Sequence, residues 1–436
     1  MNRIQILDFL TGKQVWAYYK LYLKTQWHSE TEMKALQLSK LKKLLNHCYE
    51  NIPYYRSIID ERKIEIRNFE SLEILEKFPV LTKEIIQANY NDFIPINKQS
   101  IKGVKIKQTG GTTGNILFKR NDSITRSSVW GSYRRFEDWM GLKNHNNTLI
   151  LMGGHLKKRN FIEKITSIFL GLLENSVTVD IYDTSNKTIE RVINLLQKKD
   201  FYLIRSYPQF LFSVAQQLEQ RRINFNVKAI STTAEPVMPE HRALFKKVFN
   251  AEVFDQYGCG EIGGIAYECE KHEGLHVTEE RIILEVNEHN DLIITDLDNY
   301  TMPFIRYWNA DQSIINDKLC SCGRQSKLIT QIMGRTCDYV IGINGQFLHW
   351  AYFWHLIFDS QIANKRNLRK FQIMQNTKTN LLIRLVADPL SNEEMEFIRT
   401  DIEKRLGDIN IEFLYESDIA NAKSGKYRPV INNLLK

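Results

Sequence analysis

The chain has 436 residues, more than one domain usually contains, so two or more domains are expected. Hydrophobic residues make up 43% of it, charged residues 25% and aromatic residues 11%, a composition that excludes a disordered or low-complexity protein. The net charge of +8 favours an anionic partner, such as a nucleotide phosphate or a carboxylate, but the basic residues are spread along the chain, which argues against nucleic-acid binding.

No apolar run predicts a transmembrane segment, because a helix needs about 20 apolar residues to cross a bilayer. The first residues lack the apolar core and the small-residue cleavage site of a signal peptide. We therefore expect a cytoplasmic protein. Six cysteines in a cytoplasmic chain indicate thiols or metal ligands rather than disulfides.

The N-terminal part, residues 13–60, is expected to be helical. Apolar residues such as Leu41 and Leu45 recur there at helical spacing, and Pro53 marks a break. Thr82 is expected to cap a short helix that follows.

A segment rich in glycine and threonine, QTGGTTGNIL, extends from Gln108 to Leu117 between two short alternating runs. Glycine allows a ligand to approach the backbone closely, and successive free N–H groups with threonine hydroxyls form an anion-binding nest. The pattern favours a phosphate-binding loop, with a polar hairpin turn as the alternative. It is not a Walker A loop, because Asn115 stands where that pattern requires a lysine followed by Ser or Thr.

Strand-like and helical runs alternate between residues 148 and 257, and one of the helices opens at Pro239. This alternation predicts a parallel sheet with helices on its faces. Ligands of such sheets bind beyond the carboxyl ends of the strands. The segments expected on that rim are Ser206–Pro208, Thr233–Pro236 and Tyr257–Gly258.

Short strands without helices begin at about residue 275 and predict a small antiparallel or barrel-like β subdomain at about 265–330. A boundary is expected near Gly334, which gives an N-terminal domain of residues 1–334 and a C-terminal domain of residues 335–436. The second has the size of a small α+β domain, with Ser391 capping a helix. The expected fold class is therefore α/β, with mixed, largely parallel sheets in the large N-terminal domain.

Four residues of metal-binding types lie in the expected β subdomain: Cys269 and His276 in ECEKHEGLH, and Cys320 and Cys322 in CSCGR. They would supply the four ligands of a tetrahedral zinc ion, and four protein ligands leave no position for a substrate, so the expected metal is structural. The alternatives are unliganded cysteines, or a ligand set that draws on Cys259, His272 and Cys337.

Eight short motifs follow one another along the chain: NIPYYR (51–56), FPVLTK (78–83), TGGTTG (109–114), AEP (234–236), YGCGE (257–261), MPFIRYWNAD (302–311), GRTCD (334–338) and SGKYR (424–428). In this order they resemble the adenylate-forming superfamily. Within it they look most like the phenylacetate–coenzyme A ligase branch, including its relatives in capsular-polysaccharide biosynthesis. Some members of that branch carry the same Cys/His pattern, and the resemblance covers most of the chain.

The resemblance implies an ATP-dependent ligase that activates a carboxylic acid as an acyl-adenylate and releases pyrophosphate. The acyl group would then pass to an acceptor such as coenzyme A. The implied cofactors are ATP, Mg²⁺ and structural Zn²⁺. The implied partners are a small-molecule carboxylate, ATP and an acceptor thiol, amine or hydroxyl. The C-terminal domain is expected to be mobile, with a hinge at Cys337 and Asp338.

The resemblance also implies roles for individual residues. The phosphates of ATP would contact Thr109, Gly110, Gly111, Thr112, Thr113 and Gly114, and the adenine would contact Ala234, Glu235, Pro236, Tyr257 and Gly258. Glu261 would hold magnesium, and Asp311, assisted by Arg335, would bind the ribose. Lys426 would neutralise the charge that develops between the carboxylate and the α-phosphate. The acyl pocket would be bordered by Tyr207, Pro208, Gly154 and His155.

Two departures from the pattern of the branch keep other functions open. Gly260 replaces the threonine that usually precedes the magnesium glutamate, and YVIGINGQFLHW (339–350) replaces an Arg-Gly loop of the coenzyme A ligases. The first alternative is an amide- or ester-forming ligase that acylates an amino or sugar acceptor in surface-polysaccharide biosynthesis. The second is a non-catalytic, zinc-stabilised assembly protein.

Overall fold

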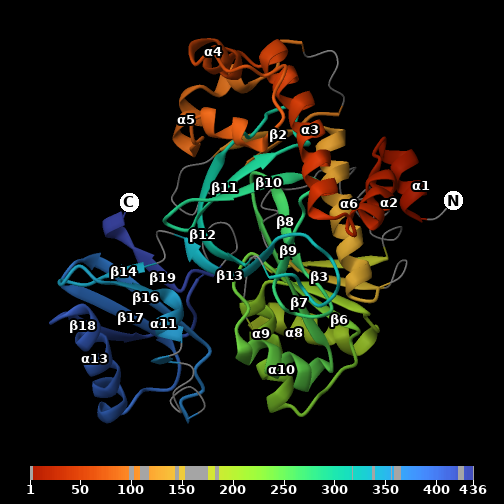
Figure 1. Ribbon diagram of the computed structural model, residues 1–436. Coiled ribbons are helices and arrows are strands. Elements are labelled where there is room, and N and C mark those ends of the chain that lie inside the picture. The colour runs from red at the N-terminus through yellow and green to blue at the C-terminus, as the bar shows by residue number, and fades with distance from the viewer. Residues whose placement is uncertain are drawn as a thin grey trace. The chain divides into compact units, whose positions relative to one another are not determined.

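A computed structural model describes residues 3–97, 103–108, 117–142, 147–152, 175–181, 186–316, 318–335, 339–354, 356–357, 365–420 and 427–435. The internal contacts divide the chain into two compact units. The first comprises Met1–Asp180 and Ile193–Met333, and the second comprises Ile181–Val192 and Gly334–Lys436. Figure 1 shows the second unit mainly in blue.

One sheet of eleven strands forms the centre of the first unit, in the order β10-β11-β12-β13-β9-β8-β7-β6-β5-β3-β4. Its parallel part consists of β3 (Thr148–Met152), β4 (Ser176–Asp180), β5 (Leu203–Ser206), β6 (Ala229–Thr233) and β7 (Glu252–Cys259). The other strands are β8 (Gly263–Glu268), β9 (Leu275–Val277), β10 (Ile282–Val286), β11 (Asp291–Asp296), β12 (Tyr307–Asn316) and β13 (Leu328–Arg335). The chain reverses at the antiparallel β7–β8 hairpin, where the parallel part ends.

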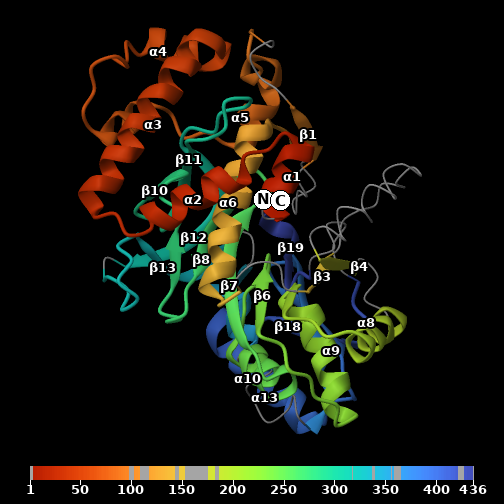
Figure 2. The ribbon, with the colours of Figure 1, turned by 90° about the vertical axis from the view of Figure 1, so that its right-hand side faces the viewer.

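Helices supply the crossovers that parallel strands require. The strands β4 to β7 are connected through α8 (Asn186–Lys198), α9 (Pro208–Gln220) and α10 (Pro239–Phe249), and Figure 1 shows α9 and α10 beside β6 and β7. Proline at the first position of α9 and α10 fits a helix start, because the missing N–H has no partner there in any case. On the other side, α6 (Ser123–Trp139) runs along the sheet beside β8 (Figure 2).

The N-terminal segment folds into α1 (Arg3–Thr11), α2 (Val15–Thr25), α3 (Glu30–Asn51), α4 (Pro53–Glu61) and α5 (Lys83–Ala88), with 3-10 turns at Leu72–Lys77 and Tyr90–Phe93. The region expected to be helical is thus three helices. The second of them starts at a capping box, in which Ser29 and Glu32 bond each other's backbone N–H groups. The expected cap of α5 is confirmed, since Thr82 Oγ1 accepts a hydrogen bond from the N–H of Ile85 at 3.4 Å.

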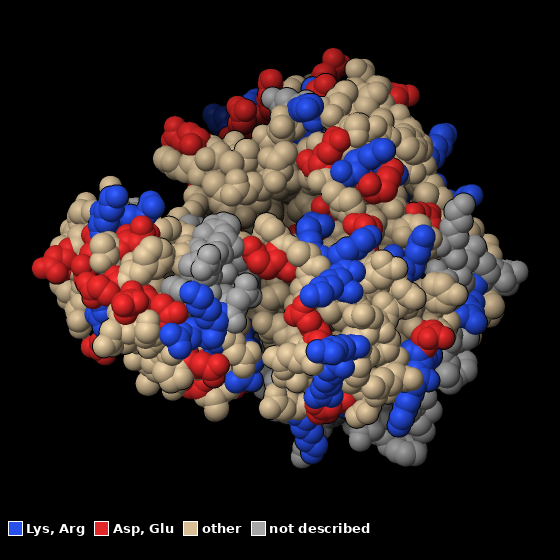
Figure 3. Space-filling view, turned by 90° about the horizontal axis from the view of Figure 1, so that it is seen from below, with Lys and Arg blue, Asp and Glu red and all other residues tan. Residues whose placement is uncertain are grey.

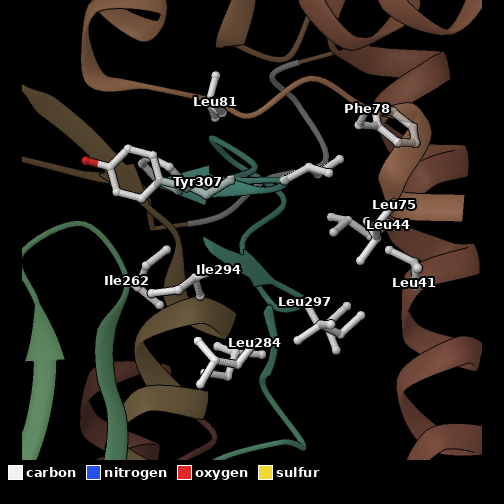
Figure 4. Close-up of a cluster of buried hydrophobic side chains, with 14 of the residues drawn as sticks. Leu41, Leu44, Leu75, Phe78, Leu81, Ile262, Leu284, Ile294, Leu297 and Tyr307 are labelled. Carbon is white, nitrogen blue, oxygen red and sulfur yellow. The ribbon is translucent and has the colours of Figure 1, made fainter. Parts of the chain in front are cut away.

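A large apolar core lies between these N-terminal helices and the antiparallel strands (Figure 4). Leu41 and Leu44 of α3 are fully buried there, together with Ile294 of β11. Backbone hydrogen bonds fix the segment after α4 to the same strands: the N–H of Leu81 donates to Arg306 O, and the N–H of Trp308 donates to Leu81 O, both at 2.9 Å. The motif FPVLTK is therefore joined directly to the motif that ends at Asp311.

The second unit contains a four-stranded sheet in the order β18-β17-β16-β19. The elements of the second unit are β14 (Tyr339–Ile341), β15 (Phe347–His349), α11 (Trp350–Trp354), β16 (Lys370–Thr377), β17 (Asn380–Val386), α13 (Asn392–Leu406), β18 (Asn410–Tyr415), β19 (Val430–Asn432) and a 3-10 turn at Asn433–Leu435. The expected capping of α13 is confirmed, because Ser391 and Glu394 form a capping box.

The α/β fold class predicted from the sequence is confirmed: a large mixed sheet is accompanied by a separate α+β part. The strands expected in a β subdomain continue the sheet of the parallel strands in one hydrogen-bonded order. No helix in the described ranges is long and apolar enough to cross a membrane. On the face shown in Figure 3, Lys and Arg are interspersed with Asp and Glu, so the net positive charge does not form one basic band there.

Tyr55 of the motif NIPYYR tests how this motif supports the segment that leads into β12. Its buried hydroxyl donates to Pro303 O at 2.9 Å and accepts from the N–H of Ile305 at 3.1 Å. Tyr55→Phe leaves both backbone groups unpaired and should lower the free energy of unfolding by about 1–3 kcal/mol. Urea unfolding measures this.

Tyr54→Phe is the matched control. The Tyr54 ring stacks on Phe93, a contact that Phe keeps, so its free energy of unfolding should stay within about 0.5 kcal/mol of the wild type. If the two variants lost the same free energy of unfolding, the hydrogen bonds of Tyr55 would not be the cause, which would contradict this account.

Candidate nucleotide site and metal cluster

The carboxyl ends of β5, β6 and β7 lie at one edge of the sheet, because these neighbouring strands are parallel. The segments that follow them are Ser206–Pro208, Ala234–Pro236 and the end of β7 at Tyr257–Gly258. This edge is where open α/β sheets bind ligands. The expected rim is therefore assembled by the register of the strands.

Tyr257 and Asp311 are in direct contact beneath this edge. The Tyr257 hydroxyl donates to Asp311 Oδ2 at 2.7 Å, and Asn309 Nδ2 reaches both the hydroxyl, at 2.7 Å, and Asp311 Oδ2, at 2.9 Å. All three side chains are at most 9% exposed. The contact joins β7, the last parallel strand, to β12 of the antiparallel part.

The backbone of β12 is unusual at this contact. Ala310, between the two polar residues, has a φ of 63°, in the left-handed region that non-glycine residues rarely adopt. The N–H of Asp311 donates to Asn309 Oδ1 at 3.1 Å, which stabilises the local bend. Ala234, directly after β6, is also left-handed, with a φ of 71°. Residues held in such conformations cluster at functional sites.

Glu235 lies at the N-terminus of α9. Its Oε2 accepts a hydrogen bond from the N–H of Gln209 at 3.2 Å, a favourable place for a carboxylate because helix N-termini carry positive partial charge. Burial, and then the charge of Glu235, raises the pKa of Tyr207 to about 12, so Tyr207 is neutral. Glu235 and Tyr207 therefore connect the loops that follow β6 and β5.

Glu261 lies in the three-residue turn of the β7–β8 hairpin. The turn is close-packed: a Cβ atom at Gly258 would overlap the carbonyl oxygen of Gly263, so only glycine fits there. Lys119 Nζ donates to the carbonyl oxygen of Glu261 at 3.2 Å. Lys119 belongs to β2 (Phe118–Asn121), which pairs with β1 (Lys105–Gln108) on either side of the glycine-rich segment.

Several predicted site residues lie outside the described residues: Thr109, Gly110, Gly111, Thr112, Thr113, Gly114, Gly154, His155, Cys337, Asp338 and Lys426. The backbone of Arg335 ends β13, but its side chain is likewise outside the description. Of the others, direct contacts join Tyr257 to Asp311, and Glu235 to the start of α9 just after Pro208. Pro236 is exposed, and Gly258 lies next to Tyr257 in β7.

Two polar residues of this region were not assigned a role from the sequence, Asn309 and Lys119. Asn309 could have been found from its spacing, two residues before Asp311 on the same face of an expected strand. No sequence pattern indicates Lys119, because its position depends on how β2 packs on the β7–β8 turn.

Cys269, His276, Cys320 and Cys322 form a cluster whose ligand atoms all lie within 4.8 Å of one another. Cys269 Sγ and Cys320 Sγ are 3.7 Å apart, and Cys322 Sγ and His276 Nε2 are 3.3 Å apart. Around a tetrahedral zinc ion with ordinary bond lengths the corresponding spacings are about 3.8 Å and about 3.6 Å. The donor set and its spacing therefore fit zinc.

The surroundings of the cluster also suit a metal. His276 Nδ1 is 2.8 Å from Ser326 Oγ, so Nε2 is the ring nitrogen that points into the cluster. Burial, and then the cations Arg324 and Arg135, lowers the pKa of His276 to about 3, which keeps the ring in its metal-binding neutral form. The N–H groups of Lys271 and Arg324 donate to the sulfurs of Cys269 and Cys322, both at 3.5 Å.

Two of the three alternative ligands, His272 and Cys259, lie outside the cluster. His272 Nδ1 is 3.1 Å from Glu268 Oε1, and its ring packs on Phe254. Cys259 ends β7 beside the Glu261 turn, and Cys337 is outside the described residues.

Comparison with known proteins gives related sequences and structures. Phenylacetate-coenzyme A ligase of Thermus thermophilus is 24% identical over 344 residues, which are 72% of this chain and 73% of that protein. The Escherichia coli phenylacetate-coenzyme A ligase is 25% identical over 346 residues, 72% of this chain and 74% of its own. Residues 345–433 match the family described as the CapK C-terminal domain. The chain is thus similar in sequence to ligases of the adenylate-forming superfamily.

The similarity is to the phenylacetate–coenzyme A ligase-like branch with its capsular relatives, and it supports an ATP-dependent adenylate-forming ligase, as the motif order predicts. The fold of the chain is similar to that of a 2-hydroxyisobutyryl-CoA ligase in the postadenylation state, with a TM-score of 0.72 and 16% identity over 94% of this chain and 92% of the other.

Asp255 is a partly buried acid of β7, two residues before Tyr257. Thr232 Oγ1 donates to its Oδ1 at 2.8 Å, and its backbone N–H donates to Glu268 Oε2 at 2.7 Å. Burial, and then the charge of Glu268, raises the pKa of Asp255 to about 7. The folded protein therefore retains a proton that the unfolded chain releases above its pKa of about 3.9.

The retained proton makes the free energy of unfolding depend on pH, and this dependence tests the protonation of Asp255. Because the folded state binds more protons between about pH 4 and pH 7, the free energy of unfolding falls as the pH rises through that window. Asp255→Asn keeps an acceptor for Thr232 and removes the titration. From pH 5 to pH 8 the wild type should therefore lose about 1–3 kcal/mol more than the variant.

Urea unfolding at pH 5 and pH 8 measures the difference. Asp200→Asn, at an exposed position, is the control and should follow the wild type. A wild type and Asp255→Asn variant with parallel pH profiles would refute the proposed protonation of Asp255.

Proposed function

We propose that this chain activates a carboxylic acid with ATP, forms an acyl-adenylate with release of pyrophosphate, and transfers the acyl group to an acceptor. The observation that carries the proposal is the Tyr257–Asn309–Asp311 contact at the carboxyl edge of the sheet, in a chain similar in sequence to ligases of the adenylate-forming superfamily. The contact brings an aromatic ring and a carboxylate together where such sheets bind nucleotides.

The nucleotide would lie along this edge. The Tyr257 ring, held by two hydrogen bonds at its hydroxyl, would stack on the adenine, and Asp311 would accept hydrogen bonds from the ribose hydroxyls. Ala234, Glu235 and Pro236, after β6, would border the base. Fixed orientation is the advantage of this arrangement, because a ring whose rotation is already restricted loses little entropy on binding.

The triphosphate would extend toward residues 109–114 and the Glu261 turn. Glu261 and phosphate oxygens would hold magnesium, which neutralises phosphate charge when bound. A carboxylate oxygen of the acid would attack the α-phosphorus, and the bond to the bridging oxygen of pyrophosphate would break. Lys426 would pair with the oxygens that gain negative charge. The acid would lie near Tyr207, Pro208, Gly154 and His155.

The acceptor is proposed to be coenzyme A, as the names of the curated relatives suggest for those proteins. The second unit would move between the two half-reactions about a hinge at Cys337 and Asp338. A second candidate is an amide- or ester-forming ligase that acylates an amino or sugar acceptor. It is favoured by the match of residues 345–433 to the CapK C-terminal domain and by the departure at residues 339–350.

Pyrophosphate release with a panel of carboxylic acids tests the proposal. The wild type should release pyrophosphate with at least one acid, and Lys426→Ala should lower that rate by about 10²–10³-fold, because it removes charge stabilisation in the transition state. Lys423→Ala, in the same segment, is the control and should retain the rate.

Equal rates for wild type and Lys426→Ala would exclude the assigned role of Lys426. No ATP binding at all would favour a non-catalytic assembly protein. Mass spectrometry of products formed with coenzyme A or with amino sugars separates the two acceptors.

Zinc is proposed to occupy the cluster of Cys269, His276, Cys320 and Cys322 as a structural ion. It would fix the segments before β9 and β13 to each other. Arg324, between Cys322 and β13, stacks over Trp27 at 4.9 Å and over Trp139 at 4.4 Å, so the stability of the cluster would be transmitted to the turn after α2 and to α6.

Cys322→Ser tests the zinc site. The wild type should contain about one zinc ion per chain, and the variant should lose it and several kcal/mol of stability, because the free energy of zinc binding is also folding free energy. Elemental analysis and thermal unfolding measure the two effects. Cys48→Ala, in the apolar core, should retain the zinc although it removes a thiol. Purified wild-type protein that is free of zinc and still folded would disprove this site.

A further inference from the structure

Two lysines face each other near the loop end of the hairpin β1–β2, where the glycine-rich segment connects the strands. The antiparallel register pairs Lys107 directly with Lys119, and Gln108 with Phe118. Directly opposed residues of such a pair project from the same face of the hairpin. Two ammonium groups therefore extend from one face, next to the end of the hairpin at which the glycine-rich segment joins the strands.

Lys119 is buried, with only 8% of its surface exposed. Its Nζ donates to Glu261 O at 3.2 Å and, with the amide of Asn121 in its hydrogen-bonding orientation, lies 3.2 Å from the Asn121 oxygen. In the described part of the chain no carboxylate is within ion-pair distance of Lys107 or Lys119. Both acceptors of Lys119 are neutral, so its charge is solvated by dipoles but not neutralised.

The surroundings disfavour two charged lysines here. Burial lowers the pKa of Lys119 to about 8; the charge of Lys107 acts in the same direction, while Cys259, Glu261 and Asp296 oppose the shift. The pKa of Lys107 is also lowered, by the surrounding protein first and then by Lys105 and Arg126. A buried cation without a counter-ion and two like charges across a strand pair both reduce stability. A bound anion with several charges would relieve both costs.

The position of the pair indicates which anion. The segment between β1 and β2 is the one assigned to the phosphates of ATP, and Lys119 contacts the turn of Glu261, the residue assigned to magnesium. We propose that Lys107 and Lys119 form a two-cation site for the β- and γ-phosphates of ATP, and for pyrophosphate as it leaves. The inference rests on the proposed function and deepens it.

The pair also accounts for a feature of the sequence. Asn115 leaves the glycine-rich segment without the lysine by which a Walker A loop reaches its phosphates. Lys107 and Lys119 supply that charge from the strands at either side. Strand residues of a paired hairpin hold a cation in place with less entropy loss than a loop lysine.

The site should distinguish polyphosphates from AMP. AMP and an acyl-adenylate lack the β- and γ-phosphates, so their affinities should not depend on either lysine. ATP and inorganic pyrophosphate carry the charges that the pair would neutralise. This selectivity separates a role in phosphate binding from a general effect on the nucleotide site.

Equilibrium binding of MgATP, inorganic pyrophosphate and AMP to the full chain tests the inference. Lys119→Gln and Lys107→Gln should each weaken ATP and pyrophosphate binding about tenfold, while AMP affinity stays within about twofold, because each removes one cation from a multiply charged ligand. Lys119→Arg should retain most of the affinity. Lys105→Gln removes an exposed lysine from the same strand, opposite Asn121, and should weaken ATP and pyrophosphate binding clearly less than either paired lysine does.

Thermal unfolding without ligand provides a second readout. Removing an uncompensated cation should leave the melting temperature of Lys119→Gln unchanged or raise it. A lower melting temperature, with ATP and AMP affinities reduced alike, would mean that Lys119 only supports the Glu261 turn, and the inference would be wrong. Lys107→Gln changes an exposed side chain, so it remains informative if Lys119→Gln folds poorly.

Failure of this inference is separable from failure of the proposed function. Acyl-adenylate formation with unchanged ATP affinity in both glutamine variants would reject the lysine pair and leave the ligase. Pyrophosphate binding that depends on both lysines, in a protein that activates no acid, would retain the pair and reject the ligase.

Discussion

The buried contact between Tyr257, Asn309 and Asp311 is the constraint on which the candidate site depends. It joins the last parallel strand to an antiparallel strand more than fifty positions later, and its hydrogen bonds are 2.7–2.9 Å long. Polar groups at such depth destabilise the fold unless each has a partner. Asn309 donates two of these bonds and the Tyr257 hydroxyl donates the third, and the left-handed Ala310 gives β12 the bend that aligns Asn309 with Asp311. A ring and a carboxylate are thereby fixed at the sheet edge.

The N-terminal motifs act on this contact from a distance. Leu81 pairs with the backbone on both sides of Tyr307, and Tyr55 bonds Pro303 and Ile305, so both motifs hold the segment that leads into β12. Neither motif follows one of the parallel strands whose ends form the rim. Their role is to fix the start of β12 against the apolar core around Leu41 (Figure 4). Both motifs thus position the strand that carries Asn309 and Asp311.

Unfavourable burial of charge is concentrated in the same region. Asp255 is partly buried within two residues of Tyr257, and Lys119 is buried against the Glu261 turn without a carboxylate partner in the described part of the chain. Such groups lower stability, and a binding site gains from them because they interact strongly with a ligand of opposite charge in a poorly solvated place. Other buried charges have partners of opposite sign, as Arg135 has in Glu280 and Arg281 in Asp296.

The sequence by itself determined the fold class, the helix starts at Lys83 and Asn392, and the four members of the Cys/His cluster, because strand–helix alternation, capping residues and ligand types are local properties. Only the tertiary structure decided the Asn309 bridge, the bond from Lys119 to Glu261, and the joining of both strand groups into one sheet. Each of these depends on residues far apart in the chain, whose meeting is set by strand order and packing and leaves no short-range pattern.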